Sequence, residues 1–162
     1  MRRGLRAALA GGILAATLAG CTSFAPVYGD RTGGDMASAR FNFAAPDSRV
    51  EQIILNRLKL SFPEPALPSD PTLDIAAAVS APQNSMSDAY AVARPVNVRV
   101  EATVTIRRNN ETVFEARRFA DTAYQGGKLT PVDLASGEGA SEVAARAAAE
   151  ALRAAILAGY RP

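Results

Sequence analysis

The sequence predicts a single α+β domain, a two-layer sandwich in which two helices cover one face of a four-stranded sheet. Two patterns carry this prediction. Residues 95–108 alternate strictly between apolar and polar side chains, as in a strand with one buried face. Residues 48–62 and 141–159 instead repeat their apolar side chains at helical spacing. Because each element has one apolar face, the element order β-α-β-β-β-α is most simply satisfied with both helices on the same side of the sheet.

The first strand and first helix are expected on either side of Pro46. Residues 39–43 alternate and predict a short strand that Pro46 ends. Ser48 and Glu51 have the spacing of a capping box, which opens a helix that must end before Pro63. The predicted apolar face holds Val50, Ile53, Ile54 and Leu58, with Ser61 at its edge. The side chains expected away from the centre of that face are Glu51, Arg57 and Lys59.

The middle of the chain predicts one strand followed by a long hairpin. Residues 73–80 alternate and form the second strand, and residues 82–89 form a polar loop. The third strand covers residues 95–108, and Asn109-Asn110 makes a turn because asparagine tolerates positive φ. Residues 112–124 return as the fourth strand. The polar face of the third strand must meet water or a partner; it carries Arg99, Glu101 and Thr103.

The C-terminal region predicts a loop and then a helix. Residues 125–139 are rich in glycine and are expected to form a loop, after which an alanine-rich helix runs from 141 to 159. The apolar stripe of this helix is Ala145, Ala148, Ala149, Leu152, Ile156 and Tyr160. Tyr124 and Tyr160 are expected in the core or at its rim.

The N-terminus has the features of an export signal. Arg2, Arg3 and Arg6 precede an uncharged apolar run, residues 7–20, which has a typical signal length and is too short to span a membrane. The run ends in Leu18-Ala19-Gly20-Cys21, which resembles the bacterial lipobox. We therefore expect residues 1–20 to be a lipoprotein signal peptide, Cys21 to carry acyl chains, residues 21–37 to be a tether, and residues 38–162 to be the domain. Two such chains anchor a protein stably to a bilayer.

Composition excludes several functions. The chain has no histidine and one cysteine, which excludes a Ser-His or Cys-His catalytic pair, a zinc site of Cys and His, and an internal disulfide. Without the three N-terminal arginines, 15 basic residues face 16 acidic ones, so no nucleic-acid partner is expected. Lys59 and Lys128 lack the motif of a Ser–Lys enzyme. We expect no enzymatic activity, no metal and no cofactor.

After Cys21 comes the segment Phe24-Ala25-Pro26-Val27-Tyr28-Gly29, and helix, long hairpin and terminal alanine-rich helix follow it. In these features the chain resembles the LptE family of lipopolysaccharide-assembly lipoproteins. The resemblance implies an outer-membrane lipoprotein on the periplasmic side that plugs an LptD-type β-barrel and helps lipopolysaccharide reach the cell surface. Thr22 is consistent with that location, since lipoproteins retained at the inner membrane commonly have Asp after the cysteine.

Two groups of residues are candidate binding sites. Arg107, Arg108, Arg117 and Arg118 cluster near the predicted hairpin, and guanidinium groups bind phosphates of the kind that lipopolysaccharide carries. The alternative is a solvated face whose charges prevent aggregation at the sheet edge. Tyr28 and Gly29 are candidates for docking to the barrel, or for packing against the domain's own sheet edge.

Two other functions fit the same sequence features. The chain could be an accessory lipoprotein of another envelope transport or secretion system, which binds lipid or protein without entering a barrel. It could also be a peptidoglycan-associated enzyme or binder. The missing histidine and the acylated cysteine weigh against that last class.

Overall fold

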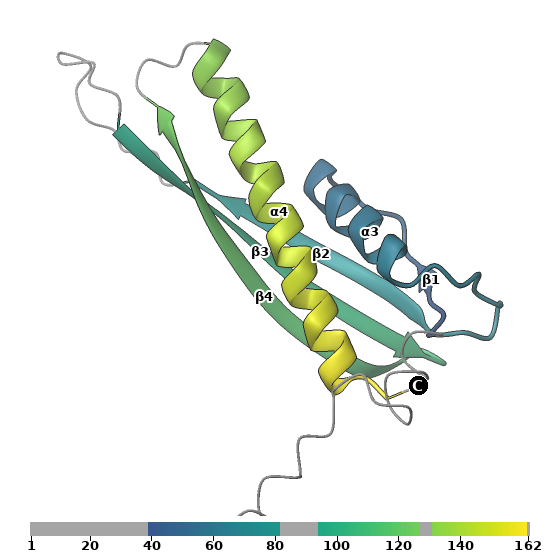
Figure 1. Cartoon of the computed structure of the whole chain (residues 1–162). Helices are drawn as coiled ribbons and strands as arrows, with labels where there is room; N and C mark the ends of the chain where they lie inside the picture. The colour runs from purple at the N-terminus through teal and green to yellow at the C-terminus, as the bar shows by residue number, and fades with distance from the viewer. Residues whose placement is uncertain (1–38, 82–93, 127–130, 162) are drawn as a thin grey trace, which may run out of the picture. The chain divides into compact units, whose positions relative to one another are not determined.

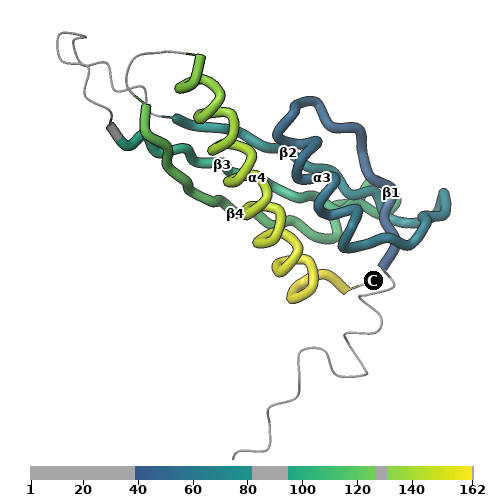
Figure 2. The backbone as a smooth tube through the Cα atoms, turned by 45° about the horizontal axis from the view of Figure 1, so that its top comes forward, coloured from purple at the N-terminus to yellow at the C-terminus, as the bar shows by residue number. Residues whose placement is uncertain are grey.

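Six elements build the domain in the predicted order, as shown in Figure 1. The computed structural model describes residues 39–81, 94–126 and 131–161, all within the unit Asp35–Pro162. The elements are β1 (Asn42–Phe43), α3 (Arg49–Ser61), β2 (Thr72–Ser80), β3 (Arg94–Arg108), β4 (Glu111–Gly126) and α4 (Pro131–Gly159). The strands form one sheet in the order β1-β2-β3-β4, with β1 parallel to β2 and the other pairs antiparallel. Both helices lie on one face of this sheet, which confirms the predicted fold class (Figures 1 and 2).

Strand β1 is shorter than predicted. Only Asn42 and Phe43 pair with β2, opposite Thr72 and Leu73, whereas residues 39–43 were expected to form the strand. The segment that precedes β2 contains Pro68 and Pro71, which cannot continue a regular strand for the earlier residues to pair with. The prediction for residues 39–41 was therefore wrong because their partner segment is rich in proline.

The N-terminus of α3 is tied to the sheet by Glu51. The Ser48 hydroxyl accepts from the Glu51 amide at 3.2 Å, and Glu51 Oε2 accepts from the Ser48 amide at 3.1 Å, which completes the predicted capping box. Oε2 also accepts from the Asp47 amide at 2.7 Å, and Oε1 accepts from the Ala77 amide of β2 at 3.1 Å. Glu51 is 8% exposed; the sequence pattern places it away from the centre of the apolar face but does not predict its burial. Its carboxylate is buried because three backbone donors satisfy it.

Strands β3 and β4 form the predicted hairpin, with one irregularity. Asn109 and Asn110 have φ of 53° and 66°, as the central residues of a type I′ turn require. Arg107 lies opposite Thr112, but Ile106 lies opposite Phe114, so the register shifts by one residue between them. This β-bulge decides which face of the sheet each later residue of β4 occupies.

The predicted glycine-rich loop at 125–139 was wrong for most of its length. Strand β4 continues to Gly126, and α4 begins at Pro131, a residue suited to a first helical position because its missing amide would have no partner there. Glycine normally destabilises a helix interior by about 1 kcal/mol relative to alanine. Gly137 has a packing role, however: a Cβ there would lie 3.3 Å from the Tyr124 ring. The glycine lets the first turns of α4 approach the sheet closely.

The hydrophobic core lies between the helices and the sheet. The predicted stripe of α4 is buried in full, and so are the inward residues of β3 from Val98 to Ile106. Near the hairpin turn the core becomes aromatic: the Phe41 ring lies 5.2 Å from Phe62 and 5.4 Å from Tyr160, and Phe114 lies 6.1 Å from Tyr160. Tyr124 is half-buried. Both tyrosines are thus core or rim residues, as predicted.

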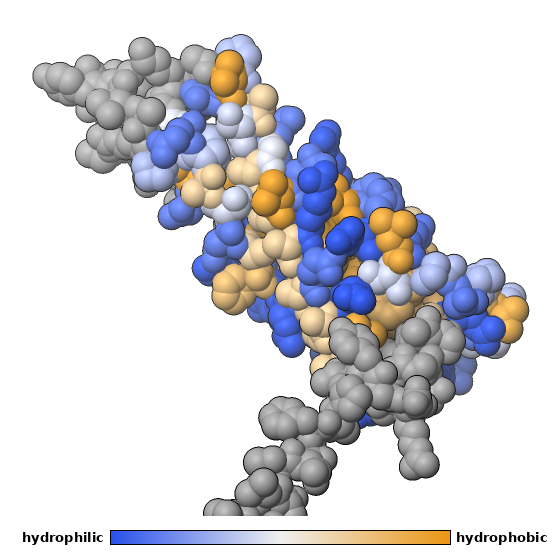
Figure 3. Space-filling model, in the orientation of Figure 1, coloured by the Kyte–Doolittle hydropathy of each residue, from blue (hydrophilic) through white to orange (hydrophobic). Residues whose placement is uncertain are grey.

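The exposed apolar side chains on the helical side are scattered among charged ones (Figure 3). They include Leu60 and Val143. No helix in the described part of the chain combines the length and the apolar character needed to cross a membrane.

Candidate functional site: two faces of the β3–β4 hairpin

Several predicted features lie outside the described residues. They are the signal peptide at 1–20, Cys21, the tether at 21–37 with Tyr28 and Gly29, and the loop at 82–89. The site that the structure describes is therefore the arginine-bearing hairpin.

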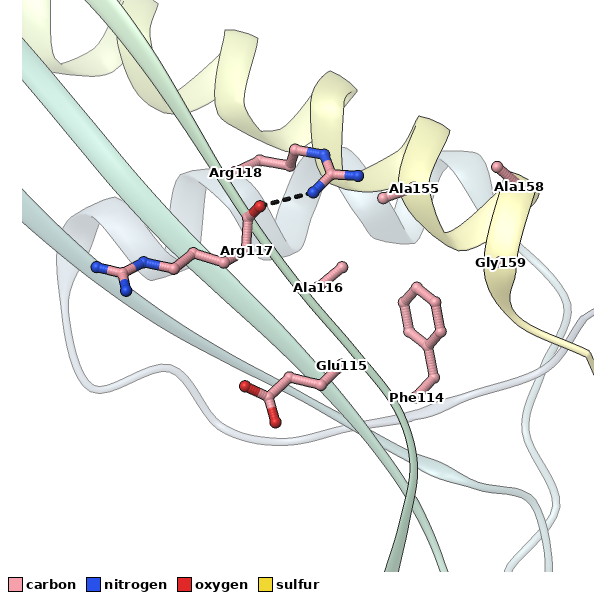
Figure 4. Close-up of a pocket in the computed structure, with 8 residues that line it drawn as sticks. All are labelled: Phe114, Glu115, Ala116, Arg117, Arg118, Ala155, Ala158 and Gly159. Atoms are coloured by element: carbon pink, nitrogen blue, oxygen red, sulfur yellow. Dashed lines mark hydrogen bonds between the residues drawn. The ribbon is translucent and has the colours of Figure 1, made fainter.

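The register of the hairpin places the predicted arginines on opposite faces of the sheet. Arg118 lies opposite Ala102, a buried residue on the helix-covered face, and Arg117 lies opposite Thr103 on the open face. Figure 4 shows the Arg118 side chain reaching toward α4 while Arg117 extends the other way. By the same alternation, Arg108 lies on the helical side of the sheet and Arg107 lies on the open face. The four arginines are close in sequence but do not form one cluster.

On the helical side, Arg118 lines a shallow groove between β4 and the end of α4. The groove has a volume of about 390 Å³ and is lined by Phe114, Glu115, Ala116, Arg117, Arg118, Ala155, Ala158 and Gly159 (Figure 4). Arg118 Nη1 donates to the backbone carbonyl of Arg117 at 2.7 Å, which holds the guanidinium close to the strand. Arg118 is exposed, so its other N–H groups are accessible to an external acceptor.

Next to the turn, the two arginines differ in their partners. Arg108 Nη2 donates to the Tyr160 hydroxyl at 3.1 Å, which connects the hairpin to the end of α4. Arg107 is exposed and has no ion pair with any residue in the described part of the chain. Of these two guanidinium groups, that of Arg107 is the one free to bind an external anion with all its donors.

The open face of the hairpin carries a row of paired charges. Arg99 and Asp121 lie directly opposite each other and form a bidentate ion pair, with Nε–Oδ1 at 2.7 Å and Nη2–Oδ2 at 2.9 Å. Arg117 pairs with Glu101 on the neighbouring strand. The Arg99 guanidinium also lies 4.5 Å from the centre of the Phe119 ring, a cation–π contact.

The bidentate pair shifts the ionisation of both groups. The hydrogen bond from Arg99 lowers the pKa of the Asp121 carboxyl below its usual value, and the same bond and charge raise the pKa of Arg99. Both groups are exposed to solvent, so the pair contributes little to folding stability. Its main effect is to fix the direction of two charged side chains on the open face.

Arg99, Glu101 and Thr103 were predicted from the sequence to lie on this face, whereas Phe119 and Asp121 were not. Phe119 is 57% exposed in the middle of the charged row. A two-residue turn at Asn109-Asn110 without a bulge would place Asp121 on the helical side. The bulge places Asp121 opposite Arg99. No residue type in the strand predicts the bulge.

The hairpin carries charged, polar and aromatic groups at its surface. Within residues 39–81, 94–126 and 131–161, no three side chains of the metal-ligating types come together. The arrangement offers guanidinium donors, carboxylate acceptors and one exposed aromatic ring, which can hold an anion or a polar protein surface.

Comparison with known proteins relates this domain to lipoprotein structures. No family model matches the sequence, and no curated protein matches it. Among solved structures, a candidate lipoprotein from Caulobacter crescentus CB15 matches with a TM-score of 0.53 at 17% identity, covering 79% of this chain and 96% of that one. A minor lipoprotein from Acinetobacter baumannii matches with a TM-score of 0.53 at 12% identity, covering 75% and 91%.

A weaker match is the rare lipoprotein B from Shewanella oneidensis, with a TM-score of 0.46 at 14% identity, covering 72% of this chain and 92% of that one. The first two matches extend over nearly the whole of the proteins concerned. The domain therefore has a fold that occurs in bacterial lipoproteins.

Proposed function

We propose that this chain is an outer-membrane lipoprotein that binds and plugs an LptD-type β-barrel and assists lipopolysaccharide assembly at the cell surface. One combination of observations carries the proposal: a lipobox ending in Cys21 precedes a domain whose fold occurs in bacterial lipoproteins. Acyl chains on Cys21 would hold the domain at the periplasmic side of the outer membrane. The chain acts there by binding, with no bond chemistry of its own.

The division of the sheet supports a binding role. The helices cover one face, so the other face keeps the side chains of Arg99, Glu101, Arg117 and Asp121 available at the surface. These groups are already paired with each other, so the face is polar without a large net charge. Such a surface suits a polar wall, and the interior of an outer-membrane barrel is polar.

Purification from native outer membranes tests this proposal. The lipidated chain, tagged at its C-terminus and extracted in mild detergent, should retain a large β-barrel protein in a one-to-one complex. The matched control is Cys21→Ser, which removes the acylation site but not the domain, and which should not retain the barrel. Recovery of the intact chain without any barrel would contradict the proposal.

The same purification separates the proposal from its alternative. An accessory lipoprotein of another envelope transport or secretion system would bring down a different partner, such as an inner-membrane ABC transporter. The lipobox and the fold are shared by both candidates, so the identity of the partner decides between them.

We further propose that the hairpin arginines bind phosphate groups of lipopolysaccharide. Because they occupy two faces, one phosphate cannot engage all four, and the test must treat them separately. Arg107→Glu and Arg108→Glu should each be compared for binding to purified lipopolysaccharide, with Arg49→Glu on α3 as a control of equal charge change. A loss of at least tenfold in affinity for Arg107→Glu supports the contact. Equal affinities for all three variants would contradict a phosphate contact at Arg107 and Arg108. The same comparison should be made for Arg117→Glu and Arg118→Glu.

The segment at Tyr28 and Gly29 is proposed to dock against the barrel. Tyr28→Ala should then reduce the amount of barrel that co-purifies with the lipidated chain, while the thermal unfolding midpoint of the domain stays unchanged. If Tyr28 instead packs on the domain's own sheet edge, the midpoint should fall and the complex should persist.

A further inference from the structure

Strand β4 is a long edge strand without a strand neighbour beyond it among the described residues. The sheet order ends at β4, which extends over Glu111–Gly126 along one side of the sheet (Figure 2). The other edge is treated differently: β1 pairs with β2 over only two residues, and the Glu51 carboxylate accepts from the Ala77 amide further along β2. An unprotected edge strand presents backbone donors and acceptors that can pair with another strand.

The side chains of β4 on the open face have a symmetric charge pattern. Counting along the strand on that face gives Glu115, Arg117, Phe119, Asp121 and Ala123. Arg117 and Asp121 lie at equal distances on either side of Phe119 and carry opposite charges. In an antiparallel copy of the strand, related by a two-fold axis at Phe119, Arg117 therefore faces the partner's Asp121 and Asp121 faces the partner's Arg117, while Glu115 faces the partner's Ala123, which is neutral.

In a two-fold symmetric pairing of two β4 strands, side chains stay on their own face of the sheet only when the axis passes through a residue. Two such registers leave a single residue of β4 unpaired. With the axis at Arg118, Glu115 would lie opposite the partner's Asp121, which places two carboxylates together. With the axis at Phe119, Arg117 lies opposite the partner's Asp121, and the two Phe119 rings lie side by side. Opposite charges and aromatic pairs stabilise directly opposed positions in a sheet, whereas like charges destabilise them.

The charged side chains are already oriented for this pairing within one molecule. Arg99 fixes the Asp121 carboxylate through two hydrogen bonds, and Glu101 pairs with Arg117. In the paired state each Asp121 carboxylate would also accept from the partner's Arg117, so charges would alternate across the junction. A carboxylate has enough acceptor sites for both.

From this pattern we propose that two copies of the chain pair antiparallel along β4, with the two-fold axis at Phe119, so that their sheets become continuous. Anchoring in one membrane leaflet would favour the pairing, because it raises the effective concentration of each copy for the other. This inference concerns the free lipoprotein and does not depend on the barrel partner.

A cysteine scan of the full-length chain in native membranes tests the register. In Phe119→Cys, the two introduced residues would face each other with Cα atoms about 5.5 Å apart, within the range for a disulfide. Mild oxidation should therefore yield a covalent dimer whose linked peptide joins position 119 to position 119. The wild-type chain is the control for any disulfide formed through Cys21.

Two matched variants make the result specific. Ala123→Cys lies on the same face of the same strand, but its partner position is Glu115, so it should give at least tenfold less dimer. Arg118→Cys reports the competing register and should also stay monomeric. Equal dimer from Phe119→Cys and Ala123→Cys, or dimer from Arg118→Cys instead, would overturn the proposal. So would an absence of dimer in a Phe119→Cys chain whose circular dichroism matches wild type.

This outcome is separable from that of the barrel purification. A failed disulfide leaves the co-purified barrel unaffected, and a missing barrel leaves the disulfide between copies unaffected. A strand of another protein paired on β4 would appear as a cross-linked product of different mass, with no 119-to-119 peptide, and would likewise refute pairing between copies.

Discussion

The two faces of the β3–β4 hairpin follow the same alternation in sequence but have opposite physical roles. On the covered face, Val100, Val104 and Ile106 are inaccessible to solvent and contact the helices. On the open face, Arg99, Glu101 and Asp121 remain exposed or half-exposed and pair across the strands. The difference shows that burial stabilises the fold from one side, while the other side keeps its paired charges at the surface and adds little to stability.

The largest expected effect comes from removing a large apolar side chain from the covered face. Leu152 is fully buried on α4, so Leu152→Ala should lower the free energy of unfolding by about 2–5 kcal/mol, through lost burial and the cavity that remains. Leu60→Ala is the control: Leu60 is 74% exposed and should change stability by less than about 0.5 kcal/mol. Urea denaturation of both variants checks this. Similar losses would show that α4 does not pack on the sheet as described.

A smaller loss is expected where the carboxylate of Glu51 joins the covered layer to the sheet edge. Glu51→Ala removes the acceptor for the Asp47, Ser48 and Ala77 amides and should cost about 1–3 kcal/mol in urea denaturation. Gln52→Ala, on the next and exposed residue, should cost much less. If the two substitutions cost the same, Glu51 does not connect α3 to β2.

Two glycines of α4 should respond in opposite directions. A Cβ at Gly159 would lie 2.8 Å from the Phe114 ring, so Gly159→Ala should destabilise the domain by about 1 kcal/mol. Nothing lies within 4 Å of a Cβ at Gly139, and Gly139→Ala should stabilise it by about 0.5–1 kcal/mol. Thermal unfolding midpoints report both signs. A rise in both midpoints would contradict the contact between α4 and Phe114.

The smallest effect is expected on the open face, and it depends on pH. Because the pKa of Asp121 is lowered in the folded state, the ion pair stabilises the fold above the unfolded carboxyl pKa of about 3.9. That contribution is lost as pH falls through the folded pKa. Asp121→Asn should therefore lower the urea midpoint slightly at pH 7, and the difference from wild type should shrink as the pH falls below the unfolded carboxyl pKa. A difference that grows on acidification would contradict the pairing with Arg99.

The covered face could be predicted from the sequence more fully than the open one. Alternation in β3 and helical spacing in α4 identified the core, because burial imposes a period that the residue types record. Two core-related features were not predictable in this way. Glu51 is a charged residue that a hydropathy pattern assigns to the surface. Its burial depends on the Ala77 amide, which is distant in sequence. The start of α4 was obscured by Gly137, whose packing against Tyr124 outweighs its poor helix propensity.

The candidate site could be predicted only as a set of residue types. The sequence identified the hairpin arginines, but the one-residue shift between Ile106 and Arg107 decides their faces. Local residue preferences set the Asn109-Asn110 turn, whereas the bulge follows from how all of β4 fits the core. The separation of Arg117 from Arg118, and the position of Phe119 among charges, therefore required the folded structure.

The proposed function depends on hydrocarbon chains on Cys21 that hold this domain at a membrane, where it acts by binding. The most direct test is the mass of the N-terminal peptide of the mature chain, purified from bacterial membranes. The predicted result is a peptide that begins at Cys21 and carries two or three acyl chains. An unmodified thiol at Cys21, or a mature chain that begins upstream of it, would contradict the proposal.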